Sequence, residues 1–260
     1  MLEEIKNAVI EASRIMLEAE DSKIDTLSKE GHANFVTEYD SRVQKELFGR
    51  LAAILPEAKF MGEEDNASKS FTDKGYLFVI DPIDGTTNFI RQNHTSCISV
   101  GLLKEGECVL GMVYNPYKKE LFCAEKGKGA YLNGSPIRVS DEPLANSILL
   151  FGTSPYYEEL AEPAFDLAYH YFRKCLDLRR SGSAAIDLCD IACGRADLYF
   201  ELRLSPWDYA ASSLIIKEAG GYICGCGLTP LQFQNPQSVI ACGKGITKDD
   251  LAYFTISKEL

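Results

Sequence analysis

The chain has 260 residues, of which 46% are hydrophobic and 25% charged, and its formal net charge at pH 7 is −11. This composition is typical of a globular protein and excludes a disordered or fibrous chain. The length allows one large domain or two modest ones that share an interface. The acidic balance argues against binding to nucleic-acid phosphates, which requires a basic face, but not against small anionic substrates held through a divalent cation.

The cysteines and the N-terminus indicate the cellular compartment in which we expect the protein. The nine cysteines are odd in number and lack the paired C-x-x-C spacing of a zinc module. We interpret them as small buried hydrophobic side chains in a reducing compartment. The N-terminus is acidic where a signal peptide would be basic, and no stretch approaches the ~18 continuous apolar residues of a membrane span. We therefore expect a cytoplasmic protein without membrane contact.

A pair of helices is predicted at the N-terminus. Residues 2–20 carry apolar side chains at three- and four-residue steps, the pattern of an amphipathic helix. A polar, glycine-containing stretch at residues 22–36 is typical of a loop. Thr37 is a suitable N-cap for a second helix, whose apolar positions before Pro56 are Val43, Leu47, Leu51 and Ile54. We interpret both apolar stripes as core packing in a layer of paired helices.

From Phe60 onward the period changes to that of strands. Residues 76–80 form an apolar, β-branched run that stops at Asp81, as a buried strand would. Turn-forming segments at residues 104–106 and 115–117 separate three further predicted strands, at residues 96–103, 108–114 and 120–124. These segments predict an antiparallel meander sheet.

After about residue 146, strands and helices alternate. The predicted strands are residues 147–152, 197–201, 222–224 and 238–242, and the predicted helices are residues 157–172, 183–193, 208–219 and 248–260. Such alternation favours an α/β second half. The expected organisation is α+β, with the helix pair and the antiparallel sheet in residues 1–146 and the α/β half in residues 147–260, packed as one compact unit.

Carboxylates gather where two predicted strands end. Gly62-Glu63-Glu64-Asp65 follows one short apolar run, and Asp81-Pro82-Ile83-Asp84-Gly85 follows another. Mg²⁺ prefers a near-octahedral set of oxygen ligands. Asp81 and Asp84, three residues apart, can present two carboxylates and the Ile83 carbonyl to one small volume. Taken alone, the string is equally compatible with a solvated Asp-Gly turn.

Two backbone amides follow these carboxylates directly. Gly85 permits the backbone to approach an anion closely, because it has no side chain. If a helix begins near Asp84, the amide groups of Gly85 and Thr86 point toward a phosphate.

The string D-P-I-D-G-T-T-N-F at residues 81–89 resembles the signature of the inositol monophosphatase family. Gly62-Glu63-Glu64 lies upstream at the family's spacing, and W-D-Y-A-A at residues 207–211 is similar to the family's downstream W-D-x-A-A element. Further segments fit at Lys29 and at residues 36–40, 182–185 and 218–221. The resemblance therefore spans about residues 29–221, most of the chain.

This resemblance implies an αβαβα layered fold and a magnesium-activated, lithium-sensitive phosphatase that is commonly dimeric. It implies two to three Mg²⁺ ions. Glu63, Asp81 and the Ile83 carbonyl would hold the first ion, and Asp81, Asp84 and Asp208 the second. A third, weaker ion could use Glu63.

The implied mechanism uses a metal-activated water. Glu63 and the Thr86 hydroxyl would orient or deprotonate this water for in-line attack on phosphorus. Asp81 belongs to the same catalytic group, and the amides of Gly85 and Thr86 would hold phosphate oxygens. The mechanism requires no covalent intermediate, and no cysteine is placed to form one.

The substrate is less closely defined than the reaction. By the resemblance, Glu201 matches the position that accepts hydrogen bonds from inositol hydroxyls, Ser183 and Ala184 match a second wall of that pocket, and Lys29 is a possible contact from the loop. Arg91-Gln92-Asn93-His94-Thr95 departs from the family's H-x-x-P stretch. Arg179 and Arg180 are both basic beside the pocket. They could bind a second substrate phosphate, but we favour a solvated or interface pair.

Three hypotheses follow, with a small-molecule phosphate ester as the ligand of the first two. The first is a phosphatase of inositol monophosphate or a related polyol phosphate. The second is the same chemistry on fructose 1,6-bisphosphate, histidinol phosphate or a nucleotide phosphate. The third is a catalytically silent relative that serves as a binding or regulatory subunit. A silent relative would be expected to have lost a metal carboxylate, and none is missing here.

Overall fold

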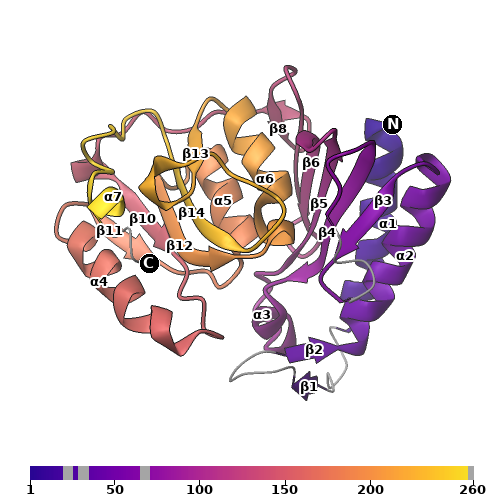
Figure 1. Ribbon diagram of the computed structural model, residues 1–260. Coiled ribbons are helices and arrows are strands. Elements are labelled where there is room, and N and C mark those ends of the chain that lie inside the picture. Colours follow the sequence, from indigo (N-terminus) through magenta and orange to yellow (C-terminus); the bar gives the residue numbers. More distant parts are fainter. Residues whose placement is uncertain (20–25, 29–34, 65–70, 257–260) are drawn as a thin grey trace.

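The computed structural model describes residues 1–19, 26–28, 35–64 and 71–256. Figure 1 shows the layers side by side: a helix pair, a large sheet, a second helix pair, a smaller sheet and an outer helix layer. The predicted αβαβα sandwich is confirmed. The helices are α1 (Leu2–Leu17), α2 (Glu38–Ile54), α3 (Thr86–Ile90), α4 (Ala161–Phe172), α5 (Ala184–Ala192), α6 (Pro206–Glu218) and α7 (Tyr253–Ile256).

The strands form one large sheet, one smaller sheet and a short hairpin. The hairpin pairs β1 (Thr26–Ser28) with β2 (Phe35–Thr37). The large sheet has the order β3 (Lys59–Gly62), β4 (Tyr76–Asp84), β5 (Cys97–Lys104), β6 (Glu107–Asn115), β7 (Glu120–Glu125), β8 (Ala130–Leu132) and β9 (Ser135–Pro136). The smaller sheet has the order β11 (Asp177–Arg179), β10 (Ile148–Phe151), β12 (Leu198–Leu204), β14 (Gln237–Cys242) and β13 (Tyr222–Cys224).

The N-terminal helix pair agrees with its sequence pattern. Thr37 caps α2 in a capping box, in which its side chain accepts from the Tyr39 amide and the Asp40 carboxylate accepts from the Thr37 amide at 2.8 Å. Val43, Leu47 and the other apolar positions of α1 and α2 pack with one face of β4–β7 in a single apolar core. The pair therefore covers the outer face of the large sheet, as its apolar stripes predict.

Strand β4 differs from the prediction at the point where the carboxylates lie. It continues through Asp81 to Asp84 instead of stopping at Asp81, and it pairs with β5 along its length. The register shifts between Asp81 and Asp84. This irregularity accommodates Pro82, which has no N–H to donate to a ladder. The two aspartates therefore stand on a distorted strand rather than on a loop.

The smaller sheet is mixed, and its edge strand was not predicted. β10 is parallel to β11 and β12, whereas β14 is antiparallel to β12 and β13. β11 has only three residues, and charged ones at both ends, so no periodic signal marks it.

The helix predicted at 248–260 is also wrong at its start, since only Tyr253–Ile256 is helical among the described residues. Thr247 and Asp250 instead bond each other's amides and form a turn.

Helix α6 lies close against the large sheet because two strand glycines leave room for it. A Cβ atom at Gly111 would lie 2.2 Å from the Ala211 carbonyl oxygen, and one at Gly101 would lie 3.0 Å from the Cβ of Ala210. Neither glycine can therefore carry a side chain without moving the helix. This close packing brings the first turn of α6, with Asp208, next to β4.

The remaining cores join the layers into one body. α5 and α6 share a core with the inner faces of both sheets, and α4 and α7 pack on the outer face of the smaller sheet, where the Tyr171 and Phe254 rings stack at 4.7 Å.

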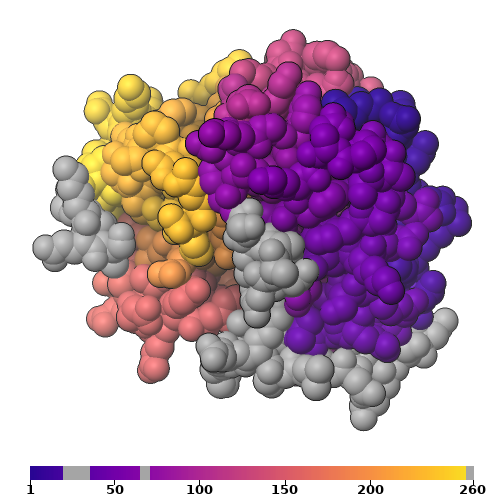
Figure 2. Space-filling model, turned by 45° about the vertical axis from the view of Figure 1, so that its right-hand side comes forward, coloured from indigo at the N-terminus to yellow at the C-terminus, as the bar shows by residue number. Residues whose placement is uncertain are grey.

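All nine cysteines are free and none is exposed, in agreement with their interpretation as small buried side chains. None of the helices in the described part of the chain combines the length and hydropathy that a membrane crossing requires. In Figure 2 the indigo-to-magenta and orange-to-yellow halves meet along one boundary.

Candidate active site

A cavity of about 560 Å³ lies between the two sheets and is lined by residues from both. Strand β4 supplies one wall, β12 supplies another, and the first turns of α5 and α6 contribute between them. Lys29, predicted as a loop contact, lies outside the described residues. The structure brings all the other predicted site residues to this cavity: Glu63, Asp81, Ile83, Asp84, Gly85, Thr86, Ser183, Ala184, Glu201 and Asp208.

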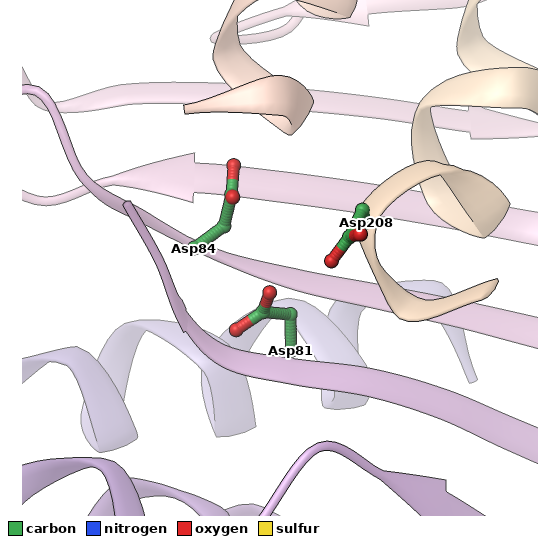
Figure 3. Close-up of side chains that lie close together, drawn as sticks. All are labelled: Asp81, Asp84 and Asp208. Atoms are coloured by element: carbon green, nitrogen blue, oxygen red, sulfur yellow. The ribbon is translucent and has the colours of Figure 1, made fainter. Parts of the chain in front are cut away.

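Three aspartates converge at one end of the cavity. Asp81 and Asp84 come from β4 and Asp208 from the start of α6, and one carboxylate oxygen from each lies within 4.8 Å of the others (Figure 3). Asp81 is 2% exposed and Asp84 8%. Glu63 follows β3, which is parallel to β4, and Gly62 pairs with Ile80. The carboxyl ends of these adjacent strands therefore bring Glu63 beside Asp81.

Each aspartate is held by hydrogen bonds that use one of its oxygens. The Ile83 amide donates to Asp81 Oδ1 at 3.0 Å. The Ser205 amide donates to Asp208 Oδ2 at 2.7 Å, as part of the capping box that begins α6. Among the hydrogen bonds of the described residues, these contacts leave the second oxygen of each carboxylate for a ligand.

Asp84 is held from the opposite half of the chain. Its Oδ2 accepts from the Ser183 hydroxyl at 2.5 Å and from the Ala185 amide at 2.8 Å. The Ser183 hydroxyl in turn accepts from the Ile186 amide as the N-cap of α5. Asp84 thereby ties β4 to the first turn of α5, which fixes the separation of the two walls at this end of the cavity.

The electrostatics of this cluster are unfavourable without a cation. Burial, followed by repulsion from Glu63, raises the pKa of Asp81 well above its ordinary value, and burial followed by repulsion from Asp84 does the same to the pKa of Asp208. Burial raises the pKa of Asp84 to about 6, although the hydrogen bonds from Ser183 and Ala185 oppose the shift. Acidic groups of one sign are therefore brought together, and the hydrogen bonds and ion pairs found among the described residues give Asp81, Asp84 and Asp208 no basic partner.

The donor set fits a hard divalent cation. Mg²⁺ binds oxygen at about 2.1 Å, so two donors on opposite sides of one ion stand about 4.2 Å apart. The aspartate oxygens lie within 4.8 Å of one another, so small side-chain adjustments suffice. A bound cation would also relieve the repulsion that raises these pKa values. The residues present could therefore hold a metal ion here.

The turn after β4 has the conformation that its glycine requires. Gly85 precedes the short helix α3 with φ of +85°, and a Cβ there would meet the Thr95 carbonyl oxygen at 3.0 Å. The Thr86 hydroxyl donates to the Ile83 carbonyl at 3.3 Å. Both the hydroxyl and the carbonyl predicted to work in the reaction thus lie together at the aspartate end of the cavity.

Glu201 stands on the other wall, in a different chemical environment. Its Oε1 accepts from the Ser154 amide at 2.8 Å and the Ser154 hydroxyl at 3.2 Å, and its Oε2 accepts from the Tyr199 hydroxyl at 2.7 Å. A Cβ on Gly152 would lie 1.9 Å from Oε2, so the carboxylate also packs against the backbone there. Burial raises the pKa of Glu201, and these hydrogen bonds oppose the rise.

The structure separates the two neighbouring arginines. Arg179 is exposed on β11 and forms an ion pair with Asp177 at 2.5 Å, as the favoured interpretation expects. Arg180 instead lines the cavity, and its charge lowers the pKa of Glu201. Arg180 is also exposed, in agreement with the favoured interpretation as a solvated residue, but it borders the cavity. Two adjacent residues of the same type can face different surroundings, and no sequence signal distinguishes them.

Sequence reasoning also missed Asp187 and Tyr156, which line the same cavity. Asp187 lies four residues after Ser183 in α5, and this spacing places both on one face of a helix. That signal was available, since a helix was predicted over residues 183–193. Tyr156 lies in the irregular segment before α4, where no periodicity indicates its direction.

Comparisons with known proteins identify a family and related structures. Residues 1–256 match the inositol monophosphatase family. Inositol monophosphatase 2 of Solanum lycopersicum is 40% identical over 205 residues, which cover 76% of this chain and 77% of that protein. Nus factor SuhB of Xylella fastidiosa is 35% identical over 206 residues, 78% of this chain and 74% of that protein. The crystal structure of extragenic suppressor protein suhB from Bartonella henselae has a TM-score of 0.89 at 29% identity and covers 99% of this chain and 98% of its own.

Proposed function

The chain belongs to the inositol monophosphatase family, and on this premise we propose that it hydrolyses a small phosphate monoester, inositol monophosphate being the substrate that fits best. The observation that carries the proposal is the convergence of Asp81, Asp84 and Asp208 in a cavity whose other wall presents Glu201. One wall has the donors for divalent cations, and the other has a carboxylate suited to polyol hydroxyls.

Each residue of the site has a distinct part in this reaction. When bound, two to three Mg²⁺ ions supply positive charge at the phosphate and lower the pKa of a water. The Glu63 carboxylate and the Thr86 hydroxyl orient the attacking water, and Glu63 takes its proton. The amides of Gly85 and Thr86 donate to phosphate oxygens as charge redistributes. Ser183 keeps Asp84 in place through its 2.5 Å hydrogen bond.

The names of the relatives leave room for the alternatives. The relatives include both inositol monophosphatases and a Nus factor. Fructose 1,6-bisphosphate, histidinol phosphate and nucleotide phosphates therefore stay as alternative substrates, and a silent regulatory relative as an alternative role. The complete set of carboxylates at the cavity supports the enzymatic role over the silent one.

The decisive test is phosphate release from a panel of polyol, sugar and nucleotide phosphates, with Mg²⁺, with EDTA, and for Asp81→Asn. We expect Mg²⁺-dependent release that is fastest with inositol monophosphate and is lost in the variant. Fastest release from another ester would change the substrate but keep the phosphatase. No release from any ester would contradict the proposal and favour the regulatory role.

We also propose that two copies of the chain pair through α4, on the outer side of the smaller sheet (Figure 1). Large apolar side chains are exposed there at helical spacing: Phe165 (57%), Tyr169 (63%), Phe172 (44%) and, just beyond the helix, Leu176 (68%). Acidic residues, Glu162 and Asp166, lie toward its start and basic ones, Arg173 and Lys174, toward its end. An antiparallel pair of α4 helices about a twofold axis would bury the apolar stripe and place the acidic start of one helix beside the basic end of the other.

Sedimentation equilibrium tests this pairing. Tyr169→Glu would place a charge at the centre of the stripe, so we expect the variant to sediment as a monomer and the parent chain as a dimer. Tyr222→Glu, at an exposed tyrosine on β13, is the matched control and should leave the dimer intact. A dimeric Tyr169→Glu variant would contradict the proposed interface.

A further inference from the structure

Two adjacent tyrosines, Tyr156 and Tyr157, line the cavity from the segment that follows β10. Tyr157 is half-buried, and the Arg203 guanidinium lies 4.4 Å from the centre of its ring. Tyr156 is 46% exposed, and its side chain makes no hydrogen bond, ring contact or cation contact with another described residue. An exposed aromatic side chain therefore stands at the site, and the proposed reaction gives it no part.

The segment that carries Tyr156 is fixed to β12. The Ser154 amide donates to Glu201 Oε1 at 2.8 Å, and the Ser154 hydroxyl donates to the Arg203 carbonyl at 3.0 Å. The Arg203 amide donates back to the Ser154 hydroxyl at 3.2 Å. Ser154 has a φ of +43°, a left-handed conformation that a residue other than glycine keeps only where its surroundings impose it. The protein itself thus determines where Tyr156 stands.

The hydroxyl end of Tyr156 lies within electrostatic range of both walls of the cavity. Burial, followed by repulsion from Glu63 and Asp208, raises the pKa of Tyr156 above its ordinary value. Repulsion from Asp84 and from Glu201 adds to the rise. The side chain therefore extends inward between the aspartate end of the cavity and Glu201, while much of its surface stays exposed.

An aromatic ring in this place suits the carbon skeleton of a substrate. In the proposed reaction the phosphate lies at the aspartates and a hydroxyl reaches Glu201, so the carbon atoms that join them lie between, beside Tyr156. Burying apolar surface on both partners is favourable. Ligand cavities commonly combine aromatic side chains with a few polar groups in this way. A carbon ring presents a broad face to the tyrosine, whereas an open chain covers less of it.

We propose that Tyr156 is a specificity-determining residue of the cavity, whose ring packs against the carbon ring of the substrate's alcohol part. This inference rests on the proposed function, because it concerns the substrate of the same site. It narrows the substrate class to phosphate monoesters of cyclic alcohols, in preference to those of open-chain alcohols. The contact acts on binding rather than on the chemical step, because the charge of the carbon ring does not change in the reaction.

The test compares three esters in the parent chain and in Tyr156→Ala. Inositol 1-phosphate and phenyl phosphate carry a carbon ring, and glycerol 2-phosphate carries an open chain. Removing the tyrosine ring should lower kcat/KM for both cyclic esters about tenfold, mainly through KM, and should change kcat/KM for glycerol 2-phosphate by less than about twofold. Tyr156→Phe keeps the ring, so this conservative variant should recover kcat/KM for the cyclic esters to within about twofold of the parent chain.

Tyr222→Ala is the matched control, because Tyr222 is 42% exposed on β13 and lies outside the cavity lining. It should leave all three esters unchanged within about twofold. Equal losses on cyclic and open-chain esters in Tyr156→Ala would overturn the inference, and so would an unchanged kcat/KM for the cyclic esters. A Tyr156→Phe variant as slow as Tyr156→Ala would assign the effect to the hydroxyl and also overturn it. If the parent chain hydrolyses none of the esters, the proposed function itself fails, which is a separate outcome.

Discussion

The two walls of the cavity hold their carboxylates in opposite ways. On the β12 wall, Glu201 accepts hydrogen bonds from the Ser154 amide and the Tyr199 hydroxyl, so its position is set by the protein. On the β4 wall, Asp81 and its neighbours repel one another, and their pKa values rise. The carboxylate of one wall is therefore already hydrogen-bonded by the protein, whereas the carboxylates of the other repel one another and could be neutralised by a cation.

The largest effect is expected on the β4 wall, where the aspartates converge. Asp81→Asn removes a charge that metal binding needs, so we expect kcat/KM to fall about 1000-fold on every ester tested. Asp73→Asn, at an exposed position before the start of β4, is the control and should have no effect. Initial-rate measurements at saturating Mg²⁺ check both. A loss confined to polyol esters would contradict the assignment of the β4 wall to the hydrolysis of every ester.

A smaller and more selective effect is expected on the β12 wall, which carries Glu201. Glu201→Gln places an amide NH₂ against a buried donor, either Ser154 or Tyr199, and it weakens hydroxyl binding. We expect kcat/KM for inositol 1-phosphate to fall about 10- to 100-fold and that for phenyl phosphate to change little. We also expect the free energy of unfolding to fall by about 1–3 kcal/mol in denaturant titrations. Equal losses on both esters would argue against separate roles for the walls.

The free energy of unfolding should depend on pH because the carboxylates of the β4 wall repel one another. The pKa of Asp84 is about 6 in the folded protein, against about 3.9 in an unfolded chain. The folded state therefore holds more protons between pH 4 and 6, and stability falls as the pH rises through this window. We expect the metal-free protein to lose about 1–2 kcal/mol between pH 5 and pH 7.5 from this group.

Thermal unfolding in EDTA at both pH values measures this loss. Mg²⁺ at pH 7.5 should restore the Tm, because the cation neutralises the carboxylates. Asp84→Asn should flatten the metal-free pH dependence. A Tm that rises from pH 5 to pH 7.5 in EDTA would contradict the assigned electrostatics.

The smallest effect concerns the two arginines. Arg180 lowers the pKa of Glu201, so Arg180→Ala should let Glu201 take up a proton at a higher pH. We expect kcat/KM for inositol 1-phosphate to fall about two- to threefold at pH 6 and less at pH 8, because an exposed charge acts weakly through water. Arg179→Ala is the matched control, since Arg179 pairs with Asp177. Identical pH profiles for both variants would remove Arg180 from the site.

Much of the fold could be read from local patterns. The Thr37 N-cap, the helix over 183–193 and the predicted strands of the large sheet each depend on neighbours a few residues apart, and the structure confirms them. The prediction was wrong where longer-range pairing decides. β4 continues past Asp81 because β5 pairs with it, and β11 exists only because β10 lies beside it.

Asp81 and Asp84 could be identified as candidate metal ligands from the sequence, because they stand three residues apart in one short motif, and Asp208 from the resemblance of its W-D-Y-A-A segment to the family. The partners of these polar groups were visible only in the folded chain. The Ser183 hydroxyl reaches Asp84 across 99 positions, Arg180 but not Arg179 lines the cavity, and Asp187 Oδ1 is buried without a hydrogen-bond partner among the described residues. Burial and hydrogen bonding depend on segments that are distant in sequence, so no local pattern encodes them.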